Sequence, residues 1–351
     1  MGVLMHPHQR RGQRCPRPVA CAACLVGGLL LLSCPRAAAQ SAQISQTMGL
    51  DPRGLGLGSA YAAVASGPFS TAWNPAGLAQ ERGLSLCPVS YRELLPGFDN
   101  DVHLYGAGVT AALEPVAAGL VYSRLDYGTV EGTNEESSEW NLHVGLGVDL
   151  ARQALHAPEH VFWGVGGAYK IARAHLFSTS GSPLAGSGWD VDLGTLFGIR
   201  LPLTDAPPSA DRASCSVRVG ITAFNVLQNE MDFEDDSSAF ESSFHFAVAS
   251  DIATAPIPPF DGGAQFLVTY ESVRFVGDAA DLSTEHRFGI ETTLLDLASV
   301  RIGYAGDDRL GEHVTYGFSL GGPRSWVRLD FASIPGFGRV EHFALVVLVP
   351  Y

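Results

Sequence analysis

The side chains of this sequence with the widest choice of chemistry are four histidines at polar positions of alternating segments: His143, His245, His286 and His313. A histidine activates a serine or cysteine only where the two lie within hydrogen-bond reach and a third group orients the ring. None of the four has a serine and an acid at a supporting spacing, and no Gly-x-Ser-x-Gly elbow joins a strand to a helix. We therefore predict that the protein is not an enzyme and that these histidines hydrogen-bond to neighbours within the fold.

Charged residues of both signs share these polar positions. The predicted interior residues are His143, Asp149, Asp190, Asp192, Arg218, His245, Arg287, Glu291, Arg301, Arg328 and Asp330. Arg173, Arg200, Asp251, Glu271 and Arg274 belong to the same set. Ion pairs among them would neutralise a polar wall, hold a neighbouring segment in place or line a path, and the sequence leaves these roles open.

The sequence has no cluster of His, Cys, Asp and Glu with the short spacings of a metal site. The acids at 232–236 and at Glu135 and Glu136 suit loose calcium binding, because carboxylates are ligands for hard cations. A solvated loop that meets lipopolysaccharide through bridging ions is the preferred interpretation. Cys87 and Cys215 are expected to pack as small apolar side chains. We predict no metal and no cofactor.

The polar positions alternate with apolar ones along most of the chain after residue 80. In WNLHVGLGVDL at 140–150, the even positions are apolar and the odd positions are polar or glycine, which is typical of a strand with one apolar face. About fourteen such strands are predicted, at 82–91, 101–112, 116–127, 138–150, 160–173, 188–200, 214–225, 240–251, 262–274, 284–295, 298–306, 312–321, 325–333 and 339–349. The long connections at 201–213 and 252–261 are either genuine insertions or places where this count slips.

Three features favour a membrane barrel over a soluble β-sandwich or propeller. The apolar faces carry more aromatic and branched side chains than one interior would absorb, the opposite faces are polar or glycine, and Lys170 is the only lysine. Strands of ~9–11 residues cross a bilayer, and closure leaves no unpaired edge. We predict an all-β fold, a transmembrane antiparallel β-barrel of about fourteen strands. Candidates for interfacial aromatic girdles are Trp140, Trp163, Trp189, Tyr270, Tyr304 and Trp326, with Trp326 on the interior face.

The start of the chain predicts export. Arginines between 10 and 17, an apolar run at 19–32 and the small residues of 37–39 form a signal peptide over 1–39, with Gln40 as the mature start. Lipoprotein processing at Cys34 is the alternative. A net charge of -14 provides no basic stripe for nucleic acid, so we predict no nucleic-acid partner.

The end of the chain predicts insertion into an outer membrane. The alternate residues Phe343, Leu345, Val347, Val349 and Tyr351 finish on an aromatic side chain, a pattern that the barrel assembly machinery reads. The expected location is the cell outer membrane. The expected partners are that machinery, outer-membrane lipids and lipopolysaccharide.

A segment rich in glycine and alanine precedes the first strand and ends in Trp73, Asn74, Pro75, Ala76, Gly77 and Leu78. Small residues allow close backbone approach, and Pro75 restricts Asn74 to extended geometry, so the Asn74 amide could bond free backbone groups. This motif resembles the N-terminal signature of the FadL-type outer-membrane proteins and, within them, the PorV/PorQ group. The resemblance implies a fourteen-stranded barrel at 82–351 with 40–81 folded inside it as a plug. A plain turn at Asn-Pro-Ala-Gly is the alternative.

Three functions follow from these patterns. The first is a plugged passive channel for small hydrophobic or amphipathic molecules. The second is a protein-binding or shuttle component of protein secretion, as in PorV-like proteins of type IX secretion, with secreted proteins as partners. The third and least favoured is an outer-membrane lipid hydrolase. Fold alone does not choose among them.

Overall fold

The computed structural model describes residues 48–94, 102–113, 115–129, 136–177, 183–203, 213–233, 237–259, 262–276, 284–307, 311–321, 325–336 and 338–349. The predicted signal peptide and Tyr351 lie outside these residues. The chain separates into two units, and the second unit, Ala38–Tyr351, holds every described residue. None of the described helices has the length and apolar character needed to cross a membrane.

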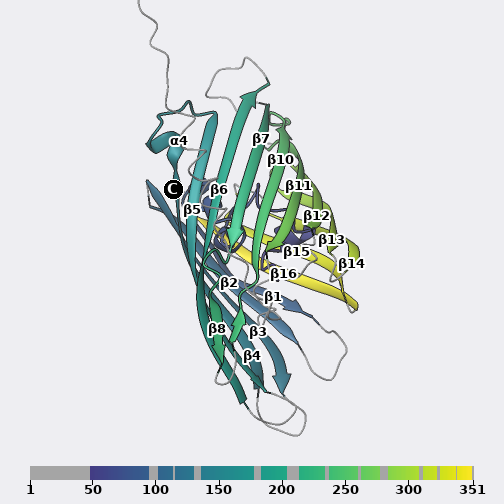
Figure 1. Cartoon of the computed structure of the whole chain (residues 1–351). Coiled ribbons are helices and arrows are strands. Elements are labelled where there is room, and N and C mark those ends of the chain that lie inside the picture. The colour runs from purple at the N-terminus through teal and green to yellow at the C-terminus, as the bar shows by residue number, and fades with distance from the viewer. Residues whose placement is uncertain are drawn as a thin grey trace, which may run out of the picture. The chain divides into compact units, whose positions relative to one another are not determined.

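The described strands form one antiparallel sheet that closes on itself (Figure 1). The strands are β1 (Leu84–Glu93), β2 (His103–Leu113), β3 (Val116–Thr129), β4 (Glu136–Asp149), β5 (Val161–Phe177), β6 (Pro183–Pro202), β7 (Ser214–Phe224), β8 (Glu230–Phe233), β9 (Ser237–Ala239), β10 (Ser242–Ala253), β11 (Ala264–Val276), β12 (Thr284–Leu294), β13 (Ala298–Asp307), β14 (Gly311–Leu320), β15 (Val327–Gly336) and β16 (Gly338–Val349). Of these sixteen, β8 and β9 form a hairpin beside β6, and pairing of β5 with β6 closes the other fourteen into a ring. The predicted strand number is confirmed.

The two ends of the barrel differ. The terminal end holds the first residue of β1, the last residue of β16 and α4 (Leu150–Gln153), whereas β8 lies at the opposite, loop end (Figure 1). The connections 203–213 and 254–263 at the terminal end join neighbouring strands, so they are insertions and the strand count does not slip. The β8–β9 hairpin was not predicted, because its strands are too short to show an alternating pattern.

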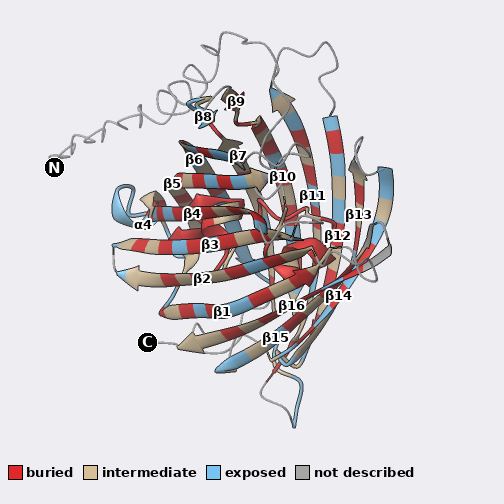
Figure 2. Ribbon diagram, turned by 90° about the horizontal axis from the view of Figure 1, so that it is seen from below, coloured by how far each residue is buried: buried red, intermediate tan, exposed pale blue. Residues whose placement is uncertain are grey.

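Burial alternates along the strands, with interior residues buried and outward residues exposed (Figure 2). On β4, Asn141 and His143 are buried, whereas the side chains of Val144 and Leu146 are 46% and 58% exposed. The same pattern holds on the other strands of the ring, so the exposed face of the barrel is largely apolar. Only a lipid environment makes such a surface favourable, because a water-soluble monomer rarely exposes a large continuous apolar patch.

Outward aromatic side chains form two rows of cross-strand partners. One row joins Tyr270, Phe288 and Tyr304 on β11 to β13, and the other joins Phe318, Phe331 and Phe343 on β14 to β16 with Tyr91 and Tyr105 on β1 and β2. Aromatic belts are enriched where a barrel meets the membrane interface. Trp326 lies just before β15 at the terminal end of the barrel and is 65% exposed, and its predicted interior position stays a prediction.

Residues 48–83, here called the N-terminal segment, contain α2 (Pro52–Gly56), α3 (Ser70–Trp73) and the 3-10 helix η2 (Pro75–Gln80). Proline begins two of these helices, where its missing N–H costs no hydrogen bond. Leu57 and Tyr61 of the segment are fully buried and share one apolar cluster with Val121 and Leu267 on opposite parts of the barrel wall. The core of the protein therefore forms between the N-terminal segment and the interior faces of the strands.

Candidate functional site

Glycines line the barrel wall where the N-terminal segment touches it. A Cβ added to any of these glycines would come into contact with the segment: Gly106, Gly108, Gly119, Gly145, Gly147, Gly164, Gly166, Gly194, Gly220, Gly289, Gly303 and Gly317. At Gly303 the added Cβ would lie 1.9 Å from the Gly58 nitrogen, and at Gly166 it would lie 2.3 Å from the Pro75 carbonyl carbon. The wall and the segment thus meet backbone to backbone, and no larger side chain fits between them.

Polar groups of the wall bind the backbone of the segment where glycines are absent. The Glu271 carboxylate accepts hydrogen bonds from the Tyr61 and Ala62 N–H groups, both at 2.8 Å. The Thr269 hydroxyl donates to the Ala60 carbonyl at 3.1 Å. These bonds satisfy buried backbone groups that the short helices of the segment cannot pair internally.

The Trp-Asn-Pro motif holds two parts of the segment together and attaches them to β6. Asn74 is extended, as the following proline predicts, and its side-chain oxygen caps η2 by accepting from the Ala76 N–H at 3.0 Å. Its amide group donates to the Ala62 carbonyl at 2.8 Å and to the Thr195 carbonyl at 3.4 Å. Trp73 packs edge-on against Tyr61 with ring centroids 5.4 Å apart. In the same motif, Pro75, Ala76, Gly77 and Leu78 are all buried.

An ion-pair network fixes the other side of the segment. Arg53 of α2 forms a bidentate pair with Glu291 of β12, at 2.8 and 3.0 Å. Arg301 of β13 also donates to Glu291, and Arg328 donates to Asp330 at 2.7 Å. Because Glu291 receives two guanidinium groups, its charge is compensated inside the barrel, and the segment is bound electrostatically as well as sterically.

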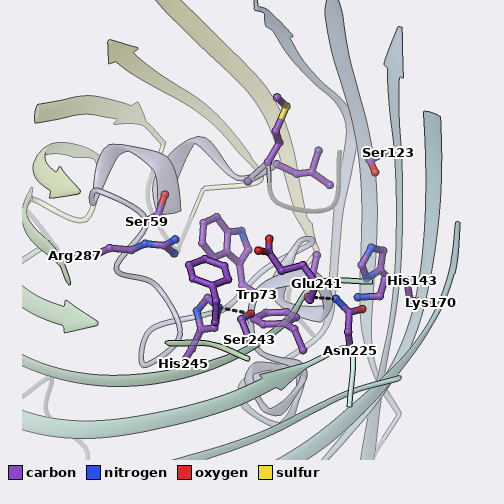
Figure 3. A pocket seen from close by; sticks show the side chains of 16 residues that line it. Ser59, Trp73, Ser123, His143, Lys170, Asn225, Glu241, Ser243, His245 and Arg287 are labelled. Atoms are coloured by element: carbon purple, nitrogen blue, oxygen red, sulfur yellow. Dashed lines mark hydrogen bonds between the residues drawn. The ribbon is translucent and has the colours of Figure 1, made fainter. Parts of the chain in front are cut away.

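A cavity of about 130 Å³, here called the loop-end cavity, lies between the segment and interior residues of β3, β4, β5, β7 and β10 to β12 (Figure 3). Its lining includes the aromatic residues Trp73, Phe224 and Phe275 and the polar residues His143, Lys170 and His245. Lys170 donates to Asp192 at 3.0 Å, and Arg287, which also lines the cavity, pairs with Glu285 at 2.6 Å. Both cations are therefore neutralised by acids, and the cavity suits a neutral molecule that has apolar and hydrogen-bonding parts.

His245 has a defined hydrogen-bonding order in this cavity. Its Nδ1 lies 2.6 Å from Glu271, and its Nε2 lies 3.1 Å from the Ser243 hydroxyl. A carboxylate only accepts hydrogen bonds, so Nδ1 carries the proton and Nε2 accepts from Ser243. The ring of Phe224 packs edge-on against the imidazole, with centroids 4.8 Å apart.

A second cavity of about 360 Å³, here called the terminal-end cavity, lies on the other side of the segment. Asp149, Arg218 and Asp251 line it, and Arg218 pairs with Asp251 at 2.5 Å. Nearby, Glu81 follows η2 within the segment, and its carboxylate accepts a hydrogen bond from the Gly67 N–H at 2.6 Å. Burial raises the pKa of the Glu81 carboxyl, although this hydrogen bond acts in the opposite direction.

The N-terminal segment lies between the two cavities along several strands. On β4, His143 lines the loop-end cavity, Gly147 touches Leu78, and Asp149 lines the terminal-end cavity. On β7, the same order is Phe224, then Gly220 against Ala62, then Arg218. The segment therefore interrupts what would otherwise be one continuous space.

The structure places the predicted interior residues in three groups. His143, His245 and Arg287 line the loop-end cavity, with Asp190 and Asp192 buried beside it; Asp149 and Arg218 line the terminal-end cavity; and Glu291, Arg301, Arg328 and Asp330 form the ion-pair network. Asp149 lies at the strand end, where it caps α4. His286, Arg173 and Arg274 are exposed on the outward face, so their predicted interior positions are wrong. These three lie where strands approach the loop end, and there the outward face becomes polar.

Some residues of the site were not singled out from the sequence. Lys170 was noted only as the sole lysine, and Asn225 and Ser243 were not considered. The alternation of β5 could have indicated Lys170, because this residue occupies an interior position directly opposite Asp190 of β6.

The four alternate residues Phe343, Leu345, Val347 and Val349 of β16 lie on its outward face. Whether the assembly machinery reads them stays a prediction.

Comparison with known proteins gives a limited result. No protein-family model and no curated protein sequence matches the chain. Among solved structures, the CymD monoaromatic hydrocarbon channel is similar at 14% identity and a TM-score of 0.45, covering 86% of this chain and 98% of that chain. The Ralstonia pickettii toluene transporter TbuX is similar at 10% identity and a TM-score of 0.44, covering 85% and 98%. The P. putida toluene transporter TodX follows at 12% identity and a TM-score of 0.36, covering 81% and 94%. Sequence identities and TM-scores this low do not indicate which molecules this chain transports.

Proposed function

We propose that this protein is an outer-membrane β-barrel that passes small hydrophobic or amphipathic molecules passively across the membrane. The observation that carries the proposal is the pair of cavities that lie in line along the barrel wall and are separated by the N-terminal segment. The closed ring and its apolar outward face support placement in a bilayer. The predicted signal peptide and the FadL-like motif at 73–78 support an outer membrane as that bilayer.

The segment would act as a plug that prevents free leakage of water-soluble molecules. Its glycine-lined seat and its bonds to Glu271 and Glu291 support a closed resting state. Molecules would collect in the loop-end cavity, whose aromatic and hydrogen-bonding lining suits amphipathic compounds. Passage to the terminal-end cavity would require a local shift of the segment.

The experiment is uptake into vesicles that contain the purified protein. We expect faster uptake of small aromatic compounds than into vesicles without protein, and no faster uptake of a large sugar such as raffinose. Equal uptake of all compounds with and without protein would contradict the channel. Assignment to the PorV/PorQ group and a role in protein secretion rest on the motif resemblance alone, and no contact in the described part of the chain favours them.

A further inference from the structure

We propose that Ser243, His245 and Glu271 form a hydrolytic site for small esters within the loop-end cavity. The three groups occur in the order nucleophile, base and orienting acid, at 3.1 Å and 2.6 Å. The sequence alone shows no serine and acid at a supporting spacing from any histidine. Ser243 lies two residues before His245 on the same face of β10, and the strand pairing brings Glu271 diagonally across from His245 on β11.

The tautomer of His245 is the one that catalysis requires. Glu271 is fully buried and accepts a hydrogen bond from His245 Nδ1–H, which leaves Nε2 unprotonated and able to take the proton of the Ser243 hydroxyl. Glu271 is itself fixed by the two backbone N–H groups of the N-terminal segment. The base therefore has one orientation, set by a carboxylate that the fold holds in place.

The surroundings of Ser243 suit acyl transfer. Arg287 and Lys170 line the same cavity (Figure 3), and although each cation is paired with an acid, their N–H groups are hydrogen-bond donors of the kind that stabilise a tetrahedral oxyanion. Trp73, Phe224 and Phe275 offer apolar contacts for the rest of the substrate. A cavity of about 130 Å³ is close to the ~150 Å³ that holds one benzene ring. The substrate class is therefore a neutral ester with a short acyl chain.

The reaction balances with water as the only co-reactant. The Ser243 oxygen attacks the ester carbonyl carbon while His245 Nε2 takes the hydroxyl proton, and this proton then passes to the departing alkoxide as the ester C–O bond breaks. Water attacks the resulting acyl-serine, again giving its proton to His245. The acid is released, and Ser243 regains its proton.

A second serine–histidine pair provides an internal control. The Ser90 hydroxyl contacts His342 Nε2 and also donates to the Leu50 carbonyl at 2.8 Å. His342 Nδ1 has no hydrogen-bond partner among the described residues, so no acid orients this ring. Neither residue lines the loop-end cavity. Ser90 should therefore lack the reactivity of Ser243.

The test uses the full chain purified in detergent, a small fluorophosphonate that labels activated serines, and hydrolysis of p-nitrophenyl acetate. We expect the label on Ser243, and at least a 100-fold loss of labelling rate and hydrolysis in Ser243→Ala and His245→Gln. Ser90→Ala should keep the labelling rate and the hydrolysis rate within twofold of the wild-type values. A label elsewhere, no label, or equal losses in Ser90→Ala and Ser243→Ala would overturn the proposal.

Glu271→Gln distinguishes the role of Glu271 in orienting His245 from its role in holding the N-terminal segment. The glutamine oxygen can still accept from the Tyr61 and Ala62 N–H groups, whereas its NH₂ group faces His245 Nδ1 and moves the imidazole proton to Nε2. We expect an unchanged unfolding temperature with at least a 100-fold slower labelling. Full labelling in this variant would contradict the assigned role. The channel is tested separately by vesicle uptake, so each proposal can fail alone.

Discussion

Gly166→Ala tests whether contact between the glycines of the barrel wall and the backbone of the N-terminal segment holds the segment in place. A Cβ at this position would lie 2.3 Å from the Pro75 carbonyl carbon and 2.6 Å from the Ala76 nitrogen. Contacts between a Cβ and other heavy atoms are rare below 3.4 Å, so the segment must move by 3.4 − 2.3, or about 1 Å. The obstacle is backbone rather than a flexible side-chain tip, so no rotamer change relieves it.

The expected size of the effect follows from the cost of overpacking, about 1–3 kcal/mol. If this strain raises the free energy of the state in which the segment contacts the wall, the population of states with a displaced segment rises by roughly 5- to 150-fold. The assay is ion conductance of a planar bilayer that contains the purified protein. We expect openings to become more frequent by that factor, while the strand pairing of the barrel, followed by circular dichroism, stays unchanged.

Gly167→Ala is the matched control, one residue further along the same strand and on its outward face. Its added Cβ would lie 3.4 Å from a Leu193 methyl group, which is an ordinary contact. We expect wild-type conductance from this variant. If Gly166→Ala and Gly167→Ala give the same conductance, the segment is not held by the glycine-lined wall and the reasoning fails.

Three further predictions concern buried polar groups. Glu271→Ala leaves two buried backbone N–H groups of the segment unpaired, so we expect a loss of about 3 kcal/mol in unfolding free energy, measured by chemical denaturation in detergent. Lys170→Met leaves the buried Asp192 without its cation and should cost about 3–5 kcal/mol, while adding Asp192→Asn should restore most of it; equal stability of the single and double variants would refute this pairing. Burial raises the pKa of Glu81, so its stabilising contribution is complete at low pH and declines as pH rises through the raised value. Thermal unfolding of Glu81→Gln should lack this decline, and an unchanged pH profile would contradict it.

Much of the fold could be predicted because alternation is a local signal. Asn141 and Val144 face opposite sides of β4 because successive side chains of any strand alternate between its two faces. A series of such strands, each with one apolar face, predicts the barrel. The pattern is less informative at strand ends. Arg173 and Arg274 are polar residues on the outward face, where the strands approach the loop end and an apolar side chain is no longer favoured.

The site was predicted only in part, because its contacts depend on register and on the path of the N-terminal segment. The role of Asn74 followed from the proline after it, which is a local restriction. The contact between His245 and Glu271 depends on the pairing of β10 with β11, which no single strand specifies. The bonds from Glu271 to Tyr61 and Ala62 join residues more than 200 positions apart. Nothing in the sequence near either partner indicates them.

Lipid contact is the central claim, and quenching of single-tryptophan proteins by brominated phospholipid tests it most directly. In one protein only Trp189 remains, an outward side chain that is 45% exposed; in the other only Trp73 remains, an interior side chain that is 8% exposed. In vesicles of brominated lipid, we expect strong quenching of Trp189 fluorescence and little quenching of Trp73. Equal quenching of the two, or none of Trp189, would contradict a barrel whose apolar face meets lipid and whose interior holds the segment.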